Sequence, residues 1–422
     1  MHQFYQGQFF NFETVRILST ARYGGADVAE FLDAVGHIRE NDAVGWHKAW
    51  SEQAQTAEEV AHEAQRHGHR VAARMAFLRA SNYTRASAYM MTGEGSKSDP
   101  RVVPLLEKVT DLFGSAMKLS DGPVHVLQIP YEKGLSIPAY LHLPPPSCRL
   151  PGKIPIVINP VGADSLQEEI YYILPSAGPE LGYAVLTFEG PGQGLTLHKH
   201  GISMRPDWEV VNGIVLDYLF EYAKENDDLD LDRIAVAGSS LGGYFALRSA
   251  ADERIKACIA IDPLYDLWDF ATRHVSPTFL NLWDKGWISD GFVDGVILLG
   301  TRFSFQMKWE IATTSRYMGV STPTELLRAM KRYTLRQAKG SYLDQVKCPV
   351  LVTGAVNSLY FDVGDHTAMV FDGLKHNDKE VWVAAKPGEG SLQAKVGAFA
   401  LCNQRVFEFL DKRFGMERNE AV

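Results

Sequence analysis

A Gly-x-Ser-x-Gly motif, the spacing of a nucleophile elbow, occupies Gly238-Ser239-Ser240-Leu241-Gly242. An elbow forces its central serine into a strained turn, so the flanking glycines are needed where side chains would clash. Residues 233–237 (RIAVA) read as a short buried strand, and residues 243–250 (GYFALRSA) read as the start of a helix. This context favours an elbow over an ordinary glycine-rich loop. We therefore expect the Ser240 hydroxyl at the carboxyl end of a sheet, where the Leu241 amide can bind an oxyanion.

The composition is typical of a soluble globular enzyme. The chain has 422 residues, 46% of them hydrophobic and 22% charged, which is enough for one large α/β domain with a sizeable insertion or second domain. The net charge of −9 argues against a nucleic-acid partner, which would require a basic surface. The four cysteines are widely spaced and form no CxxC pair, so we expect reduced thiols and neither a disulfide framework nor a metal site.

Cofactor, membrane and export signals are not found. Residues 189–194 (EGPGQG) are glycine-rich but lack the helix pattern of a nucleotide site, so we expect a turn there and no cofactor. The N-terminus has neither the basic stretch nor the apolar run of a signal peptide. No uncharged apolar run is long enough to cross a membrane. We expect a cytoplasmic protein without a membrane partner.

Residues 1–120 are helical in pattern and show no strand alternation, which predicts an N-terminal helical domain. Amphipathic segments cover residues 26–38, a stretch that Asp42 caps and that ends near residue 67, and residues 71–91. Residues 93–100 (GEGSKSDP) form the clearest break. The aromatic and methionine positions of these helices fit core packing, and they equally fit a helical layer that roofs a site.

From about residue 124 the pattern changes to strands that alternate with helices, which predicts a mostly parallel, doubly wound α/β sheet. Residues 263–340 interrupt this rhythm, because they are rich in Trp, Phe, Met and Arg and poor in strand patterns. We expect them to form a helical lid whose aromatic side chains line an apolar pocket. The sheet domain is accordingly predicted at residues 121–262 and 341–422. The expected elements are strands at 124–129, 137–143, 154–159, 184–188, 233–237, 255–262, 350–353 and 380–385, and helices at 165–174, 207–226 and 396–414.

A family resemblance is carried jointly by residues 77–83 (FLRASNY), 161–169 (VGADSLQEE), 188–194 (FEGPGQG), 205–208 (RPDW), 238–243 (GSSLGG) and 352–361 (VTGAVNSLYF). With these stretches the chain resembles, over nearly its full length, the α/β-hydrolases that carry an N-terminal helical domain. That family includes fungal polyketide-shortening hydrolases of pigment pathways, the bacterial dihydroxypseudooxynicotine hydrolase and hydrolase-like proteins of cytochalasan pathways. The resemblance implies an α/β-hydrolase fold. It also implies a homodimer, since members of the family are often dimers.

The same resemblance implies a Ser-Asp-His triad with Ser240 as the serine, but two of its positions are changed. Asn357 stands where the family has an aspartate, and Gln393 lies closest to the expected position of the histidine. A serine hydroxyl is a poor nucleophile without a base, and loss of a triad member costs several orders of magnitude in rate. His366 or His376 could serve only by reaching in from elsewhere, and we interpret both as surface histidines.

An oxyanion site would remain without the triad. The backbone amides of Gly162, Ala163 and Leu241 could stabilise an enolate as readily as a tetrahedral oxyanion. The resemblance makes Asp164, beside them, a candidate acid–base group, because the nicotine-pathway enzyme has a functional carboxylate in the matching loop. The alternative is that Asp164 or Ser165 caps the helix that follows. Three further carboxylates near strand ends are interpreted as solvated or structural: Asp262, Asp362 and Asp365.

Three functions fit these observations. The first is a condensation or cyclisation of aldol or Knoevenagel type, in fungal polyketide metabolism, on a small β-dicarbonyl or keto-aldehyde substrate. An intact elbow without its histidine favours this function, with Ser240 donating a hydrogen bond. The second is hydrolysis of a polyketide C–C, ester or thioester bond through Ser240. The third is a non-catalytic binding partner in a biosynthetic complex.

Overall fold

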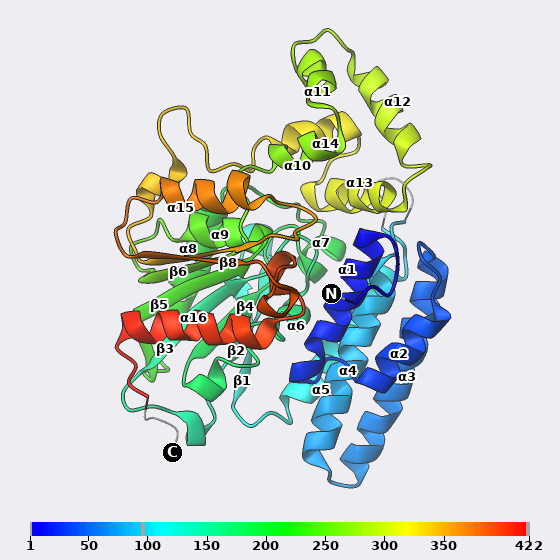
Figure 1. The fold of residues 1–422 in the computed structure, drawn as a ribbon. Coiled ribbons are helices and arrows are strands. Elements are labelled where there is room, and N and C mark those ends of the chain that lie inside the picture. The colour runs from blue at the N-terminus through cyan, green and yellow to red at the C-terminus, as the bar shows by residue number, and fades with distance from the viewer. Residues whose placement is uncertain (1, 94–97, 419–422) are drawn as a thin grey trace.

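An eight-stranded sheet organises the fold, and the computed structural model describes the chain over residues 2–93 and 98–418 (Figure 1). The strand order is β1-β2-β4-β3-β5-β6-β7-β8. β2 pairs antiparallel with β1 and with β4, and every other neighbouring pair is parallel. This confirms the predicted α/β-hydrolase fold with a mostly parallel sheet. The strands are β1 (Val124–Pro130), β2 (Ser136–His142), β3 (Ile154–Pro160), β4 (Ala184–Phe188), β5 (Leu229–Ser239), β6 (Ala257–Ile261), β7 (Val350–Ala355) and β8 (Lys379–Ala384).

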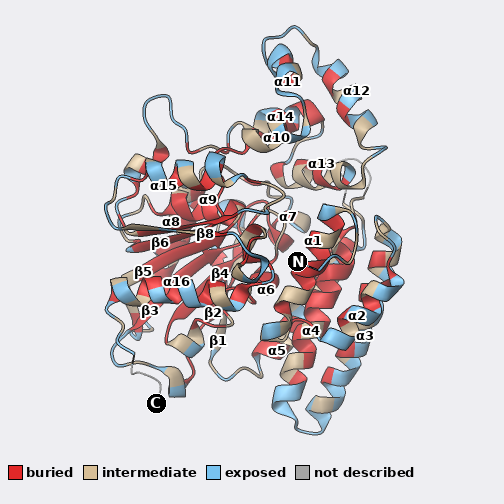
Figure 2. Cartoon of the chain, viewed as in Figure 1, coloured by how far each residue is buried: buried red, intermediate tan, exposed pale blue. Residues whose placement is uncertain are grey.

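The strands β3, β4, β6 and β7 are buried along their whole length and mainly apolar, because both faces of the sheet are covered. In β3, Ile156 and Ile158 belong to the core on one face, whereas Val157 belongs to the core on the other. Figure 2 shows the strands as the most continuously buried part of the molecule. The carboxyl ends of these strands therefore form a rigid edge on which a site can be built.

Helices pack on both faces of the sheet. α8 (Trp208–Tyr222) and α9 (Leu241–Ser249) lie on one face, and α16 (Phe399–Phe414) lies on the other (Figure 1). The Trp208 ring of α8 stacks on Phe245 of α9 with 3.8 Å between the ring centroids. The helix predicted over residues 165–174 is wrong in length, because only α6 (Gln167–Ile170) is helical and turns follow it.

The N-terminal segment is helical, as its pattern predicts. α4 packs between α3 and α5 and is buried along most of its length, which its many small residues allow. The Asp42 carboxylate accepts hydrogen bonds from the amides of Val44 and Gly45, so the predicted cap is confirmed. The predicted break at residues 93–100 includes 94–97, which lie outside the described residues, and the division into domains stays a prediction. The helices are α1 (Gln8–Ser19), α2 (Val28–His37), α3 (Ala43–Arg66), α4 (Arg70–Tyr89) and α5 (Val102–Met117).

The stretch predicted as a lid is built of helices above the carboxyl edge of the sheet (Figure 1). Its aromatic residues divide into two groups. Phe270 and Trp309 line the cavity described below, whereas Trp287 and Phe303 are 80% and 84% exposed. The expectation that the lid aromatics face inward is therefore right for only part of the set. The helices are α10 (Trp268–His274), α11 (Pro277–Asp284), α12 (Asp290–Gly300), α13 (Phe305–Met318) and α14 (Pro323–Met330).

Within the described ranges, no helix combines the length and the apolar character that crossing a bilayer requires.

Candidate active site

Ser240 lies on a sharp turn between β5 and α9, with φ 57° and ψ −121°. This is a left-handed conformation that side-chain-bearing residues rarely adopt. The Ser240 amide donates a hydrogen bond of 2.8 Å to the carbonyl oxygen of Ile261, which fixes the turn to β6. A Cβ on Gly238 would lie 2.1 Å from the carbonyl oxygen of Gly242, so the turn requires glycine at position 238. The local geometry is that of a nucleophile elbow.

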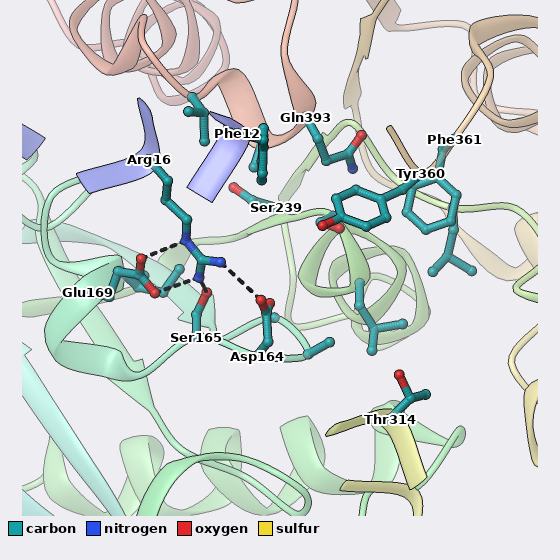
Figure 3. A pocket seen from close by; sticks show the side chains of 18 of the residues that line it. Phe12, Arg16, Asp164, Ser165, Glu169, Ser239, Thr314, Tyr360, Phe361 and Gln393 are labelled. Atoms are coloured by element: carbon teal, nitrogen blue, oxygen red, sulfur yellow. Dashed lines mark hydrogen bonds and ion pairs between the residues drawn. The ribbon is translucent and has the colours of Figure 1, made fainter. Parts of the chain in front are cut away.

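Ser240 lines a cavity between the sheet edge, the N-terminal helices and the lid (Figure 3). The cavity walls are mainly apolar, and a small number of polar side chains converge on them, as is usual for sites that bind small organic molecules. The apolar lining is supplied by Phe12, Ile170, Ile173, Leu264, Leu267, Phe270, Met330, Phe361, Val396 and Phe399.

Three of the residues that line the cavity have unpaired backbone amides. The amides of Gly162, Ala163 and Leu241 donate no hydrogen bond to any residue in the described parts of the chain. The loop that carries the first two is held from behind by Gln193, whose side-chain nitrogen donates to the carbonyl oxygens of Val161 at 2.6 Å and Gly162 at 3.0 Å. Two of these amides lie on the loop after β3 and the third lies at the start of α9. Free amides in such positions are suited to binding an anionic oxygen, although their role stays a prediction.

Asp164 lines the same cavity and is held by Arg16 of α1. The Arg16 Nη1 donates to Asp164 Oδ2 at 2.9 Å, and the Tyr89 hydroxyl donates to the same oxygen (Figure 3 shows the first contact). Asp164 Oδ1 accepts no hydrogen bond from another described side chain. The Asp164 side chain retains 29% of its accessible surface and lines the cavity.

The electrostatic environment keeps Asp164 ionised. Burial opposes the charge, but the Arg16 guanidinium and the hydrogen bonds from Tyr89 and Arg16 outweigh it and hold the pKa of Asp164 below its usual range. The alternative role as a helix cap is wrong, because α6 begins after Leu166 and receives no side-chain cap. Ser165 instead accepts a hydrogen bond of 2.8 Å from Arg16 Nη2.

Arg16 is itself fixed by carboxylates on two elements. Its Nε and Nη2 donate to the two oxygens of Glu169 at 2.7 and 2.6 Å, and its Nη1 lies 3.2 Å from Glu13 Oε2. Burial raises the pKa of Glu13 to about 7. The sequence analysis did not identify Arg16 or Tyr89, because no local motif surrounds them.

The two changed triad positions, Asn357 and Gln393, are hydrogen-bonded to other residues and supply no base. Gln393 lines the cavity; its Oε1 accepts a hydrogen bond of 2.6 Å from Ser358, and its Nε2 donates to the carbonyl oxygen of Asp262 at 2.8 Å. Among the described residues, Asn357 and Gln393 have different hydrogen-bond partners: the Asn357 side chain donates to the Ser391 hydroxyl at 3.0 Å. The two predicted positions are thus near one another in the fold but are not coupled as an acid and a base would be.

The histidines lie elsewhere. All 13 histidines fall in the described part of the chain, and none of them lines the cavity. The interpretation of His366 as a surface residue is wrong: it is 1% exposed, its Nδ1 accepts a hydrogen bond from the Tyr265 amide, and burial lowers its pKa to about 4. His376 lies half-exposed in the loop before β8 and contacts the backbone of Asp378.

The remaining carboxylates near strand ends contact other protein groups. Asp262 forms a fully buried ion pair with Lys395, 2.7 Å from Oδ1 to Nζ. Asp362 accepts hydrogen bonds from the amides of Gly364 and Asp365, and Asp365 is exposed. These contacts agree with the structural or solvated roles expected for the three aspartates.

The lid contributes a polar face to the cavity that the sequence analysis did not identify. Glu310, Thr314 and Tyr317 of α13 line the cavity at spacings of four and three residues, so they share one side of the helix. Figure 3 shows Thr314 across the cavity from Asp164, and Tyr360 reaches in beside Gln393. The i, i+4, i+7 spacing was a usable signal, but the aromatic residues around it suggested plain apolar lining.

Comparisons with known proteins give a consistent picture. A family model described as esterase FrsA-like matches residues 14–274. The chain is 56% identical to hydrolase ORFZ of Pyricularia oryzae and 53% identical to hydrolyase ccsE of Aspergillus clavatus, with 99% of both chains covered in each case. Among solved structures, it is similar to 2,6-dihydroxy-pseudo-oxynicotine hydrolase, with a TM-score of 0.71 at 19% identity over 95% of this chain and 97% of that one. The AbyA5 structure matches with a TM-score of 0.62 at 16% identity, over 94% and 95%. At these identities the structural similarities concern the fold.

Proposed function

The chain belongs to the FrsA-like esterase family, and from this premise we propose that it is an α/β-hydrolase-fold enzyme of fungal polyketide secondary metabolism that forms a carbon–carbon bond. The substrate class is a β-dicarbonyl or keto-aldehyde, joined or cyclised by an aldol or Knoevenagel reaction. One observation carries the proposal: an intact elbow lines a cavity that contains an ionised carboxylate but no histidine.

The proposed reaction begins with proton removal from carbon. Asp164 Oδ1 takes the proton from the carbon between two carbonyl groups, and the electron pair moves onto one carbonyl oxygen to give an enolate. The amides of Leu241, Gly162 and Ala163 stabilise the negative oxygen, which lowers the barrier because they are oriented in advance. The low pKa of Asp164 keeps it ionised, and the dicarbonyl carbon is acidic enough to yield its proton to a weak base once the enolate is bound.

The enolate carbon then attacks the second carbonyl carbon, and that carbonyl oxygen takes up a proton. In the Knoevenagel case a second proton leaves the same carbon and the hydroxyl departs as water, so one CH₂ and one C=O become one C=C and one H₂O. The apolar cavity favours this loss of water by limiting the access of solvent. In this reaction Ser240 donates a hydrogen bond and forms no covalent bond.

A serine hydrolase acting through Ser240 on a polyketide C–C, ester or thioester bond is the second candidate. The family description and the names of the relatives favour it. It requires a base that can reach the Ser240 hydroxyl, and the described residues offer no imidazole there. Labelling with a fluorophosphonate separates the two candidates, since rapid stoichiometric modification of Ser240 supports hydrolysis and inertness supports condensation.

The test of the proposed function uses acetylacetone and benzaldehyde as a probe pair, with the arylidene product followed by its absorbance. We expect Asp164→Asn to lower the condensation rate roughly 10²- to 10⁴-fold, the usual contribution of a positioned base. Asp372→Asn removes an exposed carboxylate outside the cavity and should leave the rate unchanged. If the wild type is active and a folded Asp164→Asn variant retains its rate, the base role is contradicted. If the wild type itself is inactive, the result points to a non-catalytic partner.

A further inference from the structure

Glu310 of α13 is a carboxyl group in the lid that faces the cavity. It is 9% exposed, and it lies among the residues that line the cavity. Gln306, one turn earlier, donates a hydrogen bond of 2.8 Å to Glu310 Oε1. Oε2 accepts no hydrogen bond from any residue that the structure describes. One oxygen is therefore fixed on the helix and the other is left for a molecule in the cavity.

The proposed condensation develops charge on two oxygen atoms. The first belongs to the enolate, for which the amides at the elbow are suited. The second belongs to the carbonyl under attack, which becomes an alkoxide and needs a proton donor of its own. The elbow lies on the sheet edge and Glu310 lies on the lid, so the two sides of the cavity can serve the two oxygens separately.

We infer that Glu310 is the catalytic acid that protonates the oxygen of the attacked carbonyl; this inference rests on the proposed condensation. Glu310 gives its proton to the alkoxide as the new carbon–carbon bond forms, and it becomes a carboxylate. Asp164 has by then gained the proton that left carbon. Transfer of that proton from Asp164 to Glu310 through solvent restores both groups, so protons balance over one turnover.

The environments of the two carboxyl groups suit opposite roles. Burial raises the pKa of Glu310 to about 7, whereas Arg16 helps hold the pKa of Asp164 below its usual range. Two carboxyls whose pKa values are displaced in opposite directions are a recurring arrangement of acid and base in active sites. The negative charges of Asp164 and Glu310 both add to the effect of burial in raising the pKa of Tyr317 and Tyr360. The two carboxyl groups are therefore close to the same two tyrosines.

Other polar groups of the cavity are less suited to this step. The Tyr317 hydroxyl already donates to Thr314 at 3.1 Å. Burial raises the pKa of Tyr360 well above its usual range, which makes it a weaker acid than Glu310. Gln393 is held by Ser358 and cannot transfer a proton as an acid. The charged and titratable groups that line the cavity are Arg16 of α1, Asp164 after β3, Glu169 of α6, Glu310 and Tyr317 of α13, and Tyr360 after β7.

The variant Glu310→Gln tests the inference, because glutamine keeps the shape and the hydrogen bond from Gln306 but has no proton to transfer. With the acetylacetone and benzaldehyde probes, we expect the wild-type rate to fall as the pH rises through about 7, since the protonated form of Glu310 is required. Glu310→Gln should lose about 100-fold in rate and lose this pH dependence. Asp284→Asn, which neutralises an exposed lid carboxylate, should retain both the rate and the pH dependence.

Glu13 is the necessary comparison, because burial raises its pKa to about 7 as well. Glu13→Gln should keep the fall in rate above pH 7. If Glu13→Gln abolishes that fall and Glu310→Gln keeps it, the inference is overturned. If the wild type condenses the probes, Asp164→Asn abolishes this activity and Glu310→Gln leaves it intact, only the role of Glu310 is overturned. Absence of wild-type condensation overturns the proposed function itself.

An infrared measurement checks the protonation of Glu310 without any substrate. The difference spectrum between wild type and Glu310→Gln should contain the C=O stretch of a protonated carboxyl at pH 6 and lose it above pH 8. A difference spectrum that shows only an ionised carboxylate at pH 6 would contradict the inference.

Discussion

At the scale of single residues, the site depends on one guanidinium that joins two parts of the chain far apart in sequence. Arg16 contacts Asp164 and Glu169 from α1, and its side chain is only 10% exposed. Charges removed from water are tolerated only when their partners and hydrogen bonds are complete. Arg16 is thus a positioning residue that orients Asp164 and keeps it ionised.

Replacing Arg16 should be costly for both stability and activity. Arg16→Met removes the guanidinium that pairs with Asp164 and leaves Glu169 with Arg85 as its cationic partner. We expect a loss of about 3–5 kcal/mol in the free energy of unfolding. The pKa of Asp164 should rise, which moves the acidic limb of the rate profile to higher pH. Urea unfolding and a pH–rate profile measure the two effects. Arg405→Met breaks only an exposed pair with Glu408 and should change the free energy by less than about 1 kcal/mol; an equal loss in both variants would contradict the special role of Arg16.

Sequence patterns were sufficient for some site residues and not for others. Ser240 was predicted from a local motif after a strand, and the end of a parallel strand fixes where the next residue lies. Asp164 was predicted from the family resemblance, and both residues line the cavity. Arg16 and Glu310 come from helices that meet the sheet edge only in the folded chain, so no short-range pattern identifies them. His366 was misassigned because its polar sequence neighbours suggest a surface. In the fold it is buried, with its ring against Phe361 and its Nδ1 accepting a hydrogen bond from the Tyr265 amide.

At the scale of elements, the loop that follows β3 must be held firmly if its amides are to bind an oxyanion. Gln193, in the turn after β4, accepts a hydrogen bond from the amide of Gly190 at 2.8 Å and donates to the carbonyl oxygens of Val161 and Gly162. One buried side chain thereby joins two strand ends. Loss of these bonds would leave buried carbonyl groups without partners.

We expect Gln193→Ala to lower the rate of condensation more than it lowers stability. Displacement of the proposed oxyanion amides should reduce kcat roughly 10²- to 10³-fold, by analogy with the loss of a single oxyanion donor. The free energy of unfolding should fall by about 1–3 kcal/mol. Steady-state kinetics with the probe pair and urea unfolding measure the two quantities. Gln404→Ala, on the exposed side of α16, is the control; an unchanged kcat in Gln193→Ala would show that the loop is held by other contacts.

Element types and order were largely predictable, because alternating strands and helices leave strong periodic signals. The lengths of the elements were less predictable. Residues 165–174 carry a helical pattern, yet only α6 forms and turns follow it. Within α6, Glu169 is bound by Arg16 of α1, a contact that no short-range pattern reveals. In the lid, aromatic content alone could not distinguish Trp309, which lines the cavity, from the exposed Trp287.

At the scale of the whole molecule, several carboxyl groups are buried with raised pKa values. Burial raises the pKa of Glu189 to about 8, and that of Glu13 and Glu310 to about 7. A group whose folded-state pKa is raised binds a proton more tightly when folded. Its contribution to stability is present at low pH and is lost as the pH rises through the folded-state value.

The protein should therefore become less stable as the pH rises from about 6 to about 9. Below pH 6 the buried histidines His142, His198 and His366 oppose this trend, because burial lowers their pKa values and the unfolded chain then binds more protons. The melting temperature, measured by calorimetry across this range, should decline most between pH 6 and pH 8. Glu189→Gln should flatten the upper part of this decline, because it removes the group with the highest of the three values. A melting temperature that rises with pH over the same interval would contradict the burial of these groups in neutral form.

The way in which Gln393 is held has a consequence for building a Ser-His-Asp triad at this site. Its amide spans Ser358 and the backbone of Asp262, while Asn357 has turned to Ser391 and Lys395 occupies the carboxylate of Asp262. A histidine introduced at position 393 would have no free carboxylate to set the tautomer of its imidazole. A working triad therefore requires at least two coordinated substitutions, because a histidine alone at position 393 would gain no acid partner.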